Sequence, residues 1–449
     1  MTLALPRWAR GQIPGHPVGR AVAASALVGW AGTGVWISAS ALFFTRLLGL
    51  TASQVGYGLA MGGVLGLLAM VPISSLVRRR HAGRVAAALQ VVRGLSFLSF
   101  LLVDSVGGLY AALALVSVTD GPGKMFGQIV VGRFVPERER TPTMAAVQVA
   151  TNIGVTLGAL LGTVGLLRVD RAAFDAVVVF VAAAFFLSAW LLAHTTWRQS
   201  GVGAAEPAAG GRQSLGRRLR SLAPPLRDGR FAVLTAGNGL LSLHIPLIGV
   251  MTPLWLGHRT SVPPAVMGGL LLLNTVTVVL LQVPLGRRVV GVRGGVRAAS
   301  AAGALQAAGC GLLSLAAFVP AGWAAASLAG AVLAFTLGEI LQVTAGWTLS
   351  FAFAPEDHGQ AVYLGFFGLG TEAVAVFGPA ALVWLTTAFG APGFAVAAVV
   401  LAAAALLVRA ACAPVRTRVS PGRRDGPAEP AVLSVPGAPN GSTPGQRGC

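Results

Sequence analysis

Apolar residues fill most of the chain in runs of about 20, separated by short polar segments. A helix of about 20 residues crosses the ~30 Å hydrocarbon core of a bilayer, so each run predicts one membrane-spanning α-helix. The alternating strands of about 10 residues that form transmembrane β-barrels are not evident. Twelve spans are predicted, centred within residues 22–44, 53–76, 85–103, 106–132, 144–167, 172–193, 231–256, 264–286, 298–319, 322–350, 361–387 and 392–412.

The longest polar interruption divides these spans into two sets of six. Residues 195–230 are rich in Gly, Pro and Arg, which predicts a cytoplasmic linker between a bundle at 21–194 and a second bundle at 231–413. Residues 1–20 form a cytoplasmic amino terminus in this scheme. Residues 414–449 are rich in Pro and Gly without periodicity, which predicts a disordered cytoplasmic tail.

The two halves share short matches at equivalent places. "VPISSLVRRRHAG" follows the second span and "VPLGRRVVGVRGG" follows the eighth, while "FVPE" follows the fourth and "FAPE" the tenth. Parallel repeats of this kind build many secondary transporters, whose substrate site lies near the midplane between the halves. We therefore expect an all-α membrane protein with twelve transmembrane helices in two pseudo-symmetric six-helix bundles.

Composition and charge agree with a membrane protein. Only 10% of the residues are charged, compared with about 25% in a soluble domain. Most of the 33 Lys and Arg residues fall in segments that a topology with both termini inside assigns to the cytoplasm, as the positive-inside rule requires. This distribution predicts a multi-pass protein of the plasma (inner) membrane, and it explains the net charge of +19 without nucleic-acid binding.

No group of residues predicts an enzyme. The sequence has no Gly-x-x-x-x-Gly-Lys-Ser/Thr loop for a nucleotide. Cys310, Cys412 and Cys449 are too far apart for a disulfide framework or a metal-ligand pattern. We expect no cofactor and no metal, so the energy for transport would come from an ion gradient or from the substrate.

Ionisable residues inside the predicted spans are the main candidates for function, because a charged side chain at the bilayer centre costs roughly 2.5–3.5 kcal/mol. Glu339 and Glu372 lie near the middle of the tenth and eleventh spans, which contain no Lys or Arg. A carboxylate without a cation lowers that cost by taking up a proton. Both are therefore predicted to couple protons or to bind substrate; the alternative is a protonated glutamate hydrogen-bonded between helices.

Further polar residues in the spans are candidates for the same site. Asp120 and Lys124 are spaced i, i+4, which allows a salt bridge, and Asp120 is also a candidate to face a cavity. Arg93 is expected to reach the interface or to pair with a loop carboxylate. His244, close to Pro246, is a candidate for proton relay or for holding a helix bend.

Other side chains are expected to line a central cavity, although hydrogen bonds between helices would explain the polar ones equally well. These cavity candidates are Trp36, Asn152, Asn238, Asn274 and Gln342. In the fifth span, Gly154, Gly158 and Gly162 recur every four residues and make one helix face smooth. We expect that face to pack against a helix of the opposite half.

Together these features resemble the major facilitator superfamily over roughly residues 20–413. The resemblance rests on the loop after the second span and its repeat, on "GWAGTGVWISASALFFTRLLGL", and on "GEILQ" with "FAPEDHGQAVYLGFFGLGTEA". Within the superfamily the chain is most similar to proton-coupled drug-efflux permeases of high-GC bacteria. The resemblance implies two bundles that rock about a central site.

The loop after the second span departs from the pattern of these relatives. Their Pro-x-Gly-x-x-x-Asp-Arg-x-Gly signature latches the two halves, but here Ser74 stands at the glycine position and Arg78 at the aspartate position. The basic part of the latch is kept and its acidic partner is not. The gating candidates that the resemblance implies are Arg78, Arg79, Arg84, Gly286 and Arg287.

The expected function is proton-coupled efflux of small hydrophobic, drug-like or antibiotic-like compounds by alternating access. Its cavity is expected to have few polar side chains. The expected partners are a small-molecule substrate, protons and the lipid bilayer, with the chain acting as a monomer. Two alternatives stay open: uptake of a nutrient or metabolite by proton symport, and a membrane sensor or assembly factor that transports nothing.

Overall fold

The computed structural model describes residues 13–47, 49–74, 82–165, 170–200, 223–263, 265–355 and 360–413. The gating candidates Arg78 and Arg79 lie outside these residues. So do the first twelve residues, most of the linker, and the segment 414–449. What the sequence predicts for these parts stays a prediction.

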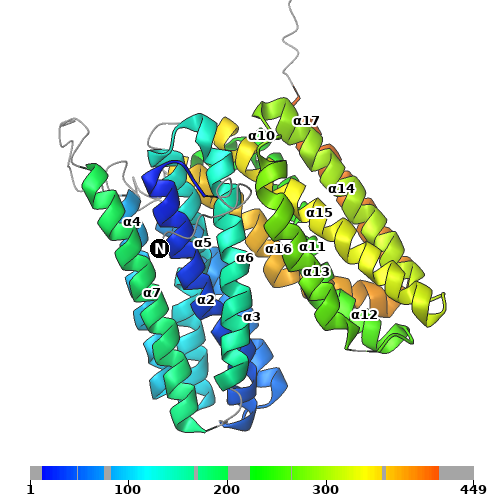
Figure 1. The fold of residues 1–449 in the computed structure, drawn as a ribbon, viewed down its shortest axis with the longest axis horizontal. Coiled ribbons are helices and arrows are strands. Elements are labelled where there is room, and N and C mark those ends of the chain that lie inside the picture. Colours follow the sequence, from blue (N-terminus) through cyan, green and yellow to red (C-terminus); the bar gives the residue numbers. More distant parts are fainter. Residues whose placement is uncertain are drawn as a thin grey trace, which may run out of the picture. The chain divides into compact units, whose positions relative to one another are not determined.

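Twelve long helical segments in the described residues correspond one to one with the predicted spans (Figure 1), so the twelve-helix all-α fold is confirmed. Eleven are long and apolar enough to cross a membrane; α5, which carries charged and small residues, falls outside that set. In chain order the segments are α2 (Pro17–Arg46), α3 (Ala52–Ser74), α4 (Ala82–Leu98) with its 3-10 extension (Ser99–Leu102), α5 (Val106–Phe134), α6 (Glu137–Gly165), α7 (Arg171–Ser200), α10 to α12 (Gly229–Leu241, His244–Pro246 and Thr252–Arg259), α13 (Val266–Gly286), α14 (Gly291–Leu315), α15 (Ala321–Phe353), α16 (Gln360–Phe389) and α17 (Pro392–Ala411). A short helix, α9 (Ala223–Arg227), precedes α10.

Most helix packing lies within two sets, α2–α7 and α10–α17, which we call the first and second halves. In the first half α2 packs against α6 and α7, α3 against α5, and α4 against α7. In the second half α14 packs against α15 and α17, and α10 against α16 and α17. Contacts of α6 with α13 and of α3 with α16 join the halves.

The glycine face of α6 packs within its own half, which corrects the expectation of a partner in the opposite half. A Cβ added to Gly154 or Gly158 would overlap backbone atoms of α2 at Leu27 and Ala31, and one added to Gly162 would overlap Ser38. The absence of side chains lets the two backbones approach closely, as is common in membrane helices. The spacing of the glycines predicts a close contact, but it does not identify the partner helix.

The seventh span is irregular around Pro246. The α-helical pattern breaks at Ser242 and resumes as His244–Pro246, followed by a π-helical turn at Leu247–Met251. A proline removes one backbone donor and its ring clashes with the carbonyl four residues earlier, so a bend here has a local cause. His244 lies at this break, in agreement with one of the two interpretations of its position.

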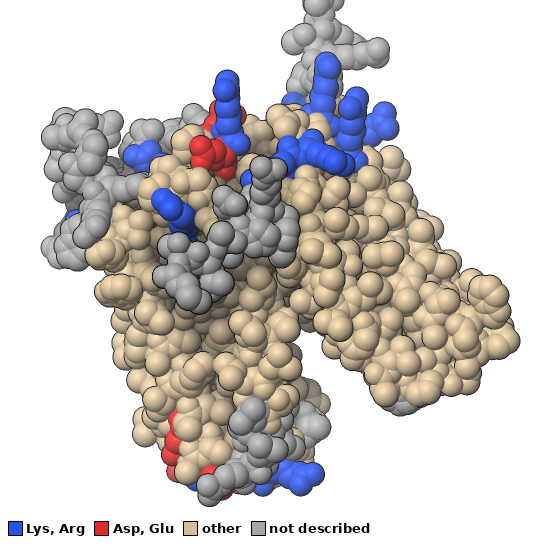
Figure 2. Space-filling view, in the orientation of Figure 1, with Lys and Arg blue, Asp and Glu red and all other residues tan. Residues whose placement is uncertain are grey.

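Charged residues gather at the helix ends. Figure 2 shows Lys and Arg concentrated at one end of the visible face, with an uncharged band below them. Because successive helices run in opposite directions, this end, which we call the basic end, carries Arg20, Arg84, Arg133, Arg138, Arg140, Arg227, Arg230, Arg287, Arg288, Arg293, Arg297 and Arg409. An uncharged middle between charged ends is the pattern of a membrane-spanning protein.

The α2–α6 contact can be tested with Gly158→Ala. The added methyl group would meet the Ala31 backbone, which cannot rotate away, so we expect a loss of about 1–3 kcal/mol in stability. Gly269→Ala is the matched control, because Gly269 lies exposed within α13 with nothing within 4 Å of an added Cβ. The measurement is the thermal unfolding midpoint of both purified variants in detergent. Equal midpoints would contradict the close contact.

Candidate substrate cavity

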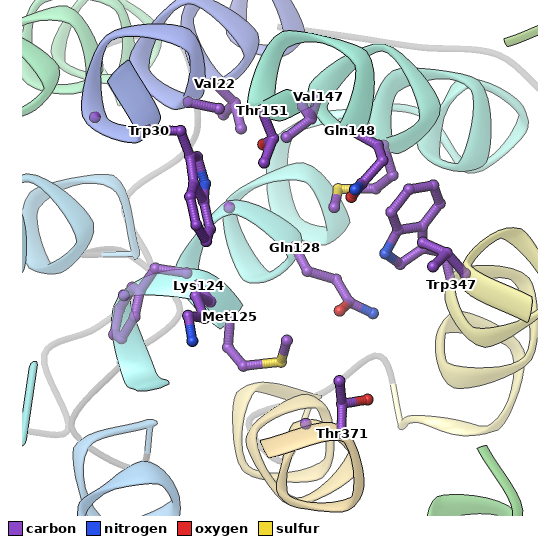
Figure 3. A pocket seen from close by; sticks show the side chains of 18 of the residues that line it. Val22, Trp30, Lys124, Met125, Gln128, Val147, Gln148, Thr151, Trp347 and Thr371 are labelled. Carbon is purple, nitrogen blue, oxygen red and sulfur yellow. The ribbon is translucent and has the colours of Figure 1, made fainter. Parts of the chain in front are cut away.

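A cavity of about 450 Å³ lies in the middle of the described structure and is lined by both halves. Figure 3 shows Trp30 of α2, Lys124 and Gln128 of α5, and Thr151 of α6 on one side. Trp347 of α15 and Thr371 of α16 stand across from them. The volume is within the range of small-molecule sites.

A chain of four charged side chains crosses from the first half to the second. Arg93 of α4 forms an ion pair with Asp120 of α5. Lys124 Nζ lies 2.9 Å from Asp120 Oδ2, which confirms that the i, i+4 pair forms, and 3.2 Å from Glu372 Oε1 of α16. Two positive and two negative charges therefore neutralise one another at membrane depth, where each alone would be costly.

This network corrects two expectations. Glu372 has no cation in its own helix, but Lys124 of the other half supplies one. Arg93 pairs with Asp120 inside the bundle rather than with a loop carboxylate, and its guanidinium also lies 4.3 Å from the centre of the Phe185 ring. Both partners are distant in sequence, so helix periodicity could not reveal them.

Glu339 is different from the other two carboxylates. Its side chain lines the cavity and is half-buried. Among the described residues it forms no ion pair, and its hydrogen-bond donor is the amide of Asn274, at a long 3.4 Å. The same amide donates to Thr336 Oγ1 at 2.8 Å, so Glu339 receives the weaker bond. Its carboxylate can therefore accept a proton without breaking an ion pair.

His244 lies buried on the cavity wall. Its Nδ1 is 3.1 Å from the carbonyl oxygen of Leu241 and 3.4 Å from Nε2 of Gln306, whose side chain packs over Gly338. The bond to a carbonyl favours the tautomer with hydrogen on Nδ1, which leaves Nε2 as an acceptor. The position is compatible with a bend and with proton transfer.

An amide cluster contributes much of the polar surface of the second half. Gln342 Nε2 donates to Asn238 Oδ1 at 2.9 Å and lies 3.4 Å from Ser242 Oγ, and all three residues line the cavity. Gly346 leaves room for the Asn238 side chain, since a Cβ there would come within 2.9 Å of Asn238 Oδ1. With the first-half residues Gln90, Gln128 and Gln148, the lining has more polar side chains than we expected, while its surface is mainly apolar.

Three cavity candidates lie elsewhere in the described structure. Trp36 packs in an aromatic cluster with Phe44, Phe97 and Phe100, at centroid distances of 4.4 to 5.6 Å. Asn274 bonds to Thr336 and Glu339, as given above, and Asn152 is absent from the cavity lining. The aromatic lining comes instead from residues that the sequence did not single out, namely Trp30, Phe126, Phe185, Trp347 and Phe367.

Between the cavity and the basic end, neutral contacts join the halves. Gln128 Nε2 donates to Ser350 Oγ at 2.8 Å, and the hydroxyl oxygens of Thr141 and Thr348 are 3.3 Å apart. Gly286, one of the gating candidates, lets α13 approach α6, because a Cβ there would lie 3.1 Å from that of Ala145. Arg287 and Arg84 flank the basic ends of α13 and α4.

Two sets of membrane helices that share a central polar cavity define a transporter fold, and the comparisons with known proteins identify the family. The chain belongs to the Major Facilitator Superfamily, whose family model matches residues 21–364. The chain is thus a multi-pass membrane protein of a superfamily of secondary transporters, which bind small-molecule substrates within the membrane. No curated protein matches the sequence.

Solved structures confirm the fold at low sequence identity. A bacterial homologue of the iron transporter ferroportin, in an outward-facing state, is 17% identical with a TM-score of 0.68, covering 88% of this chain and 98% of its own. The human organic anion transporter MFSD10 is 16% identical with a TM-score of 0.59, and the match covers 90% of this chain and 100% of MFSD10. The E. coli fucose:proton symporter FucP is 10% identical with a TM-score of 0.59, covering 88% and 98%.

The ion pair between Lys124 and Glu372 can be tested with Glu372→Gln. Lys124 keeps Asp120 as a partner, so we expect the protein to fold while the halves part more readily at the basic end. The measurement is thiol labelling of Thr141→Cys, at the contact with Thr348, with the native cysteines replaced. Labelling should be several-fold faster with Glu372→Gln than without it. An unchanged rate would show that the pair does not hold the halves together.

Proposed function

We propose that the protein is a proton-coupled exporter of small, mainly hydrophobic compounds, and that Glu339 is its proton-binding group. The observation that carries this proposal is the difference between the three carboxylates at membrane depth. Asp120 and Glu372 are held by Lys124, and Asp120 also by Arg93. Among the described residues Glu339 has only neutral contacts, so protonation of its carboxylate would break no ion pair.

The conformational state of the protein can be inferred from the side of the cavity on which the two halves contact each other. With the basic end in the cytoplasm, as the positive-inside rule requires, the contacts of Gln128 with Ser350 and of Thr141 with Thr348 lie on the cytoplasmic side of the cavity. We therefore assign the arrangement to an outward-facing state, in which Glu339 would take up a proton from outside. The similarity to an outward-facing relative supports this assignment.

Export rests on the resemblance to drug-efflux permeases together with the aromatic part of the lining. Trp30, Trp347, Phe126 and Phe367 offer apolar surface to a substrate of low polarity. One specific observation favours the second candidate, uptake by proton symport. The amides of Gln90, Gln128, Gln148, Asn238 and Gln342 would suit a substrate with many hydrogen-bonding groups.

The test is proton movement in proteoliposomes loaded with a pH-sensitive dye. Addition of a transported compound should move protons in the wild type, and Glu339→Gln should abolish this movement while leaving expression and folding intact. Substrate and protons moving in opposite directions support export, and movement in the same direction supports symport. Resistance profiling of a drug-sensitive host that expresses the protein supplies the compounds.

Asp175→Asn is the matched control for Glu339→Gln. Asp175 is an exposed carboxylate outside the cavity and pairs with Arg171 at 3.1 Å, so its neutralisation should leave proton movement unchanged. Proton-dependent transport that survives in Glu339→Gln would exclude Glu339 as the coupling group. Asp120 and Glu372 would then be the candidates to examine.

A further inference from the structure

The charges around the cavity do not cancel completely. Arg93 and Lys124 are matched by Asp120 and Glu372 in one connected network. Glu339 lines the cavity outside that network, and when ionised it adds one negative charge. Of the helices in contact with α15, the described titratable groups that also line the cavity are His244, Glu372 and Lys124, the last on α5, which reaches α15 through Gln128 and Ser350. When Glu339 is ionised, one positive charge bound beside it would therefore make the cavity neutral.

Two glutamines of the cavity lining also hold acceptors that lack a donor among the described residues. Gln342 and Gln90 both line the cavity, and in each the Oε1 atom is buried without a partner in the described structure. The amide nitrogen of each is already used, by Asn238 and Ser188 respectively. Both are acceptors, and a buried acceptor without a donor costs about 1–3 kcal/mol. Both oxygens are closed off from the cavity, so a donating ligand reaches them only if the glutamine side chains turn.

The negative group and one of these acceptors lie on the same helix face. Glu339, Gln342 and Gly346 follow α15 at spacings of three and four residues, and Trp347 follows Gly346; all four line the cavity. The face combines a carboxylate, an amide side chain and an indole ring. Indole rings attract cations over their faces, in addition to providing apolar contact area.

We infer that the substrates are organic cations, namely protonated amines with an aromatic or aliphatic body, whose ammonium group binds at Glu339. The inference rests on the proposed function, since it specifies the substrate class of the same cavity. Proton and ammonium group would occupy one carboxylate in turn. When a proton binds the Glu339 carboxylate, the ammonium loses its counter-charge and leaves, so one proton exchanges for one monovalent cation without net charge transfer.

Three ligands of similar size and different charge test the inference: naphthylethylammonium, naphthylethanol and naphthylpropionate. Their binding to the purified full-length protein is measured by titration calorimetry. We expect the ammonium to bind about tenfold or more tightly than the alcohol, as a charged hydrogen bond would give, and the carboxylate most weakly. Lowering the pH should weaken binding of the ammonium and leave that of the alcohol unchanged.

Two variants separate a local contact from the overall charge. Glu339→Gln should remove the preference for the ammonium and its pH dependence, while retained binding of the alcohol shows that the protein is folded. Asp175→Asn removes the same amount of charge outside the cavity and leaves Glu339, so the preference should remain. Loss of the preference in both variants would mean that only net charge matters, and it would overturn binding at Glu339.

Other outcomes also decide the question. Equal binding of the three ligands, tighter binding of the carboxylate, or no binding by any of them overturns the inference. A pH dependence that persists in Glu339→Gln would belong to His244 and would overturn competition at Glu339. Failure of this inference can be distinguished from failure of the proposed function. An exporter of neutral compounds still moves protons in proteoliposomes but shows no preference for cations. A cation-binding protein without proton coupling shows the preference and no proton movement.

Discussion

Lys124 bonds two carboxylates at once, one in its own helix and one in the opposite half. A lysine at membrane depth must be neutralised, and this one is held by Asp120 and Glu372 at 2.9 and 3.2 Å. The pairing links α5 to α16 and, through Asp120, to Arg93 of α4. Because the network is balanced, Glu339 is left as the described carboxylate of the cavity wall that has no cation beside it. The chemistry proposed for the cavity depends on this separation between matched and unmatched groups.

The contacts within a half differ in kind from those between halves. Within the first half, Gly154, Gly158 and Gly162 bring α6 against the backbone of α2. Such packing cannot open without a cavity or a shift of a whole helix. Between the halves, the described bonds are side chain to side chain, as between Gln128 and Ser350. The neutral ones among these bonds can be exchanged for bonds to water at small net cost, whereas the pair of Lys124 and Glu372 is costlier to separate. The halves can therefore move as units once that pair opens.

Local patterns predict the helices well, because an apolar run of sufficient length has one stable conformation in a bilayer. They also predict the pair of Asp120 and Lys124, since spacing on one helix is geometry that the sequence contains. The partners of Glu372 and Arg93 could not be found in this way, because their contacts depend on which helices are neighbours. The aromatic contacts of Trp36 could not be predicted for a related reason. Spans that are apolar on all sides carry no periodicity to distinguish a lipid-facing, core-facing or cavity-facing position.

The polar content of the cavity is a consequence of the second half as much as of the charged network. Gly346 admits the Asn238 side chain beside α15, and this contact orients Gln342 so that its amide nitrogen is used and its carbonyl oxygen is not. In the described structure, the helix that carries the carboxylate without a cation thus also carries an acceptor without a donor, although that acceptor is closed off from the cavity. An anionic or purely apolar ligand would leave the carboxylate without a counter-charge. Selection by charge would therefore arise from what the packing of α10 against α15 leaves unpaired, rather than from a large number of direct contacts.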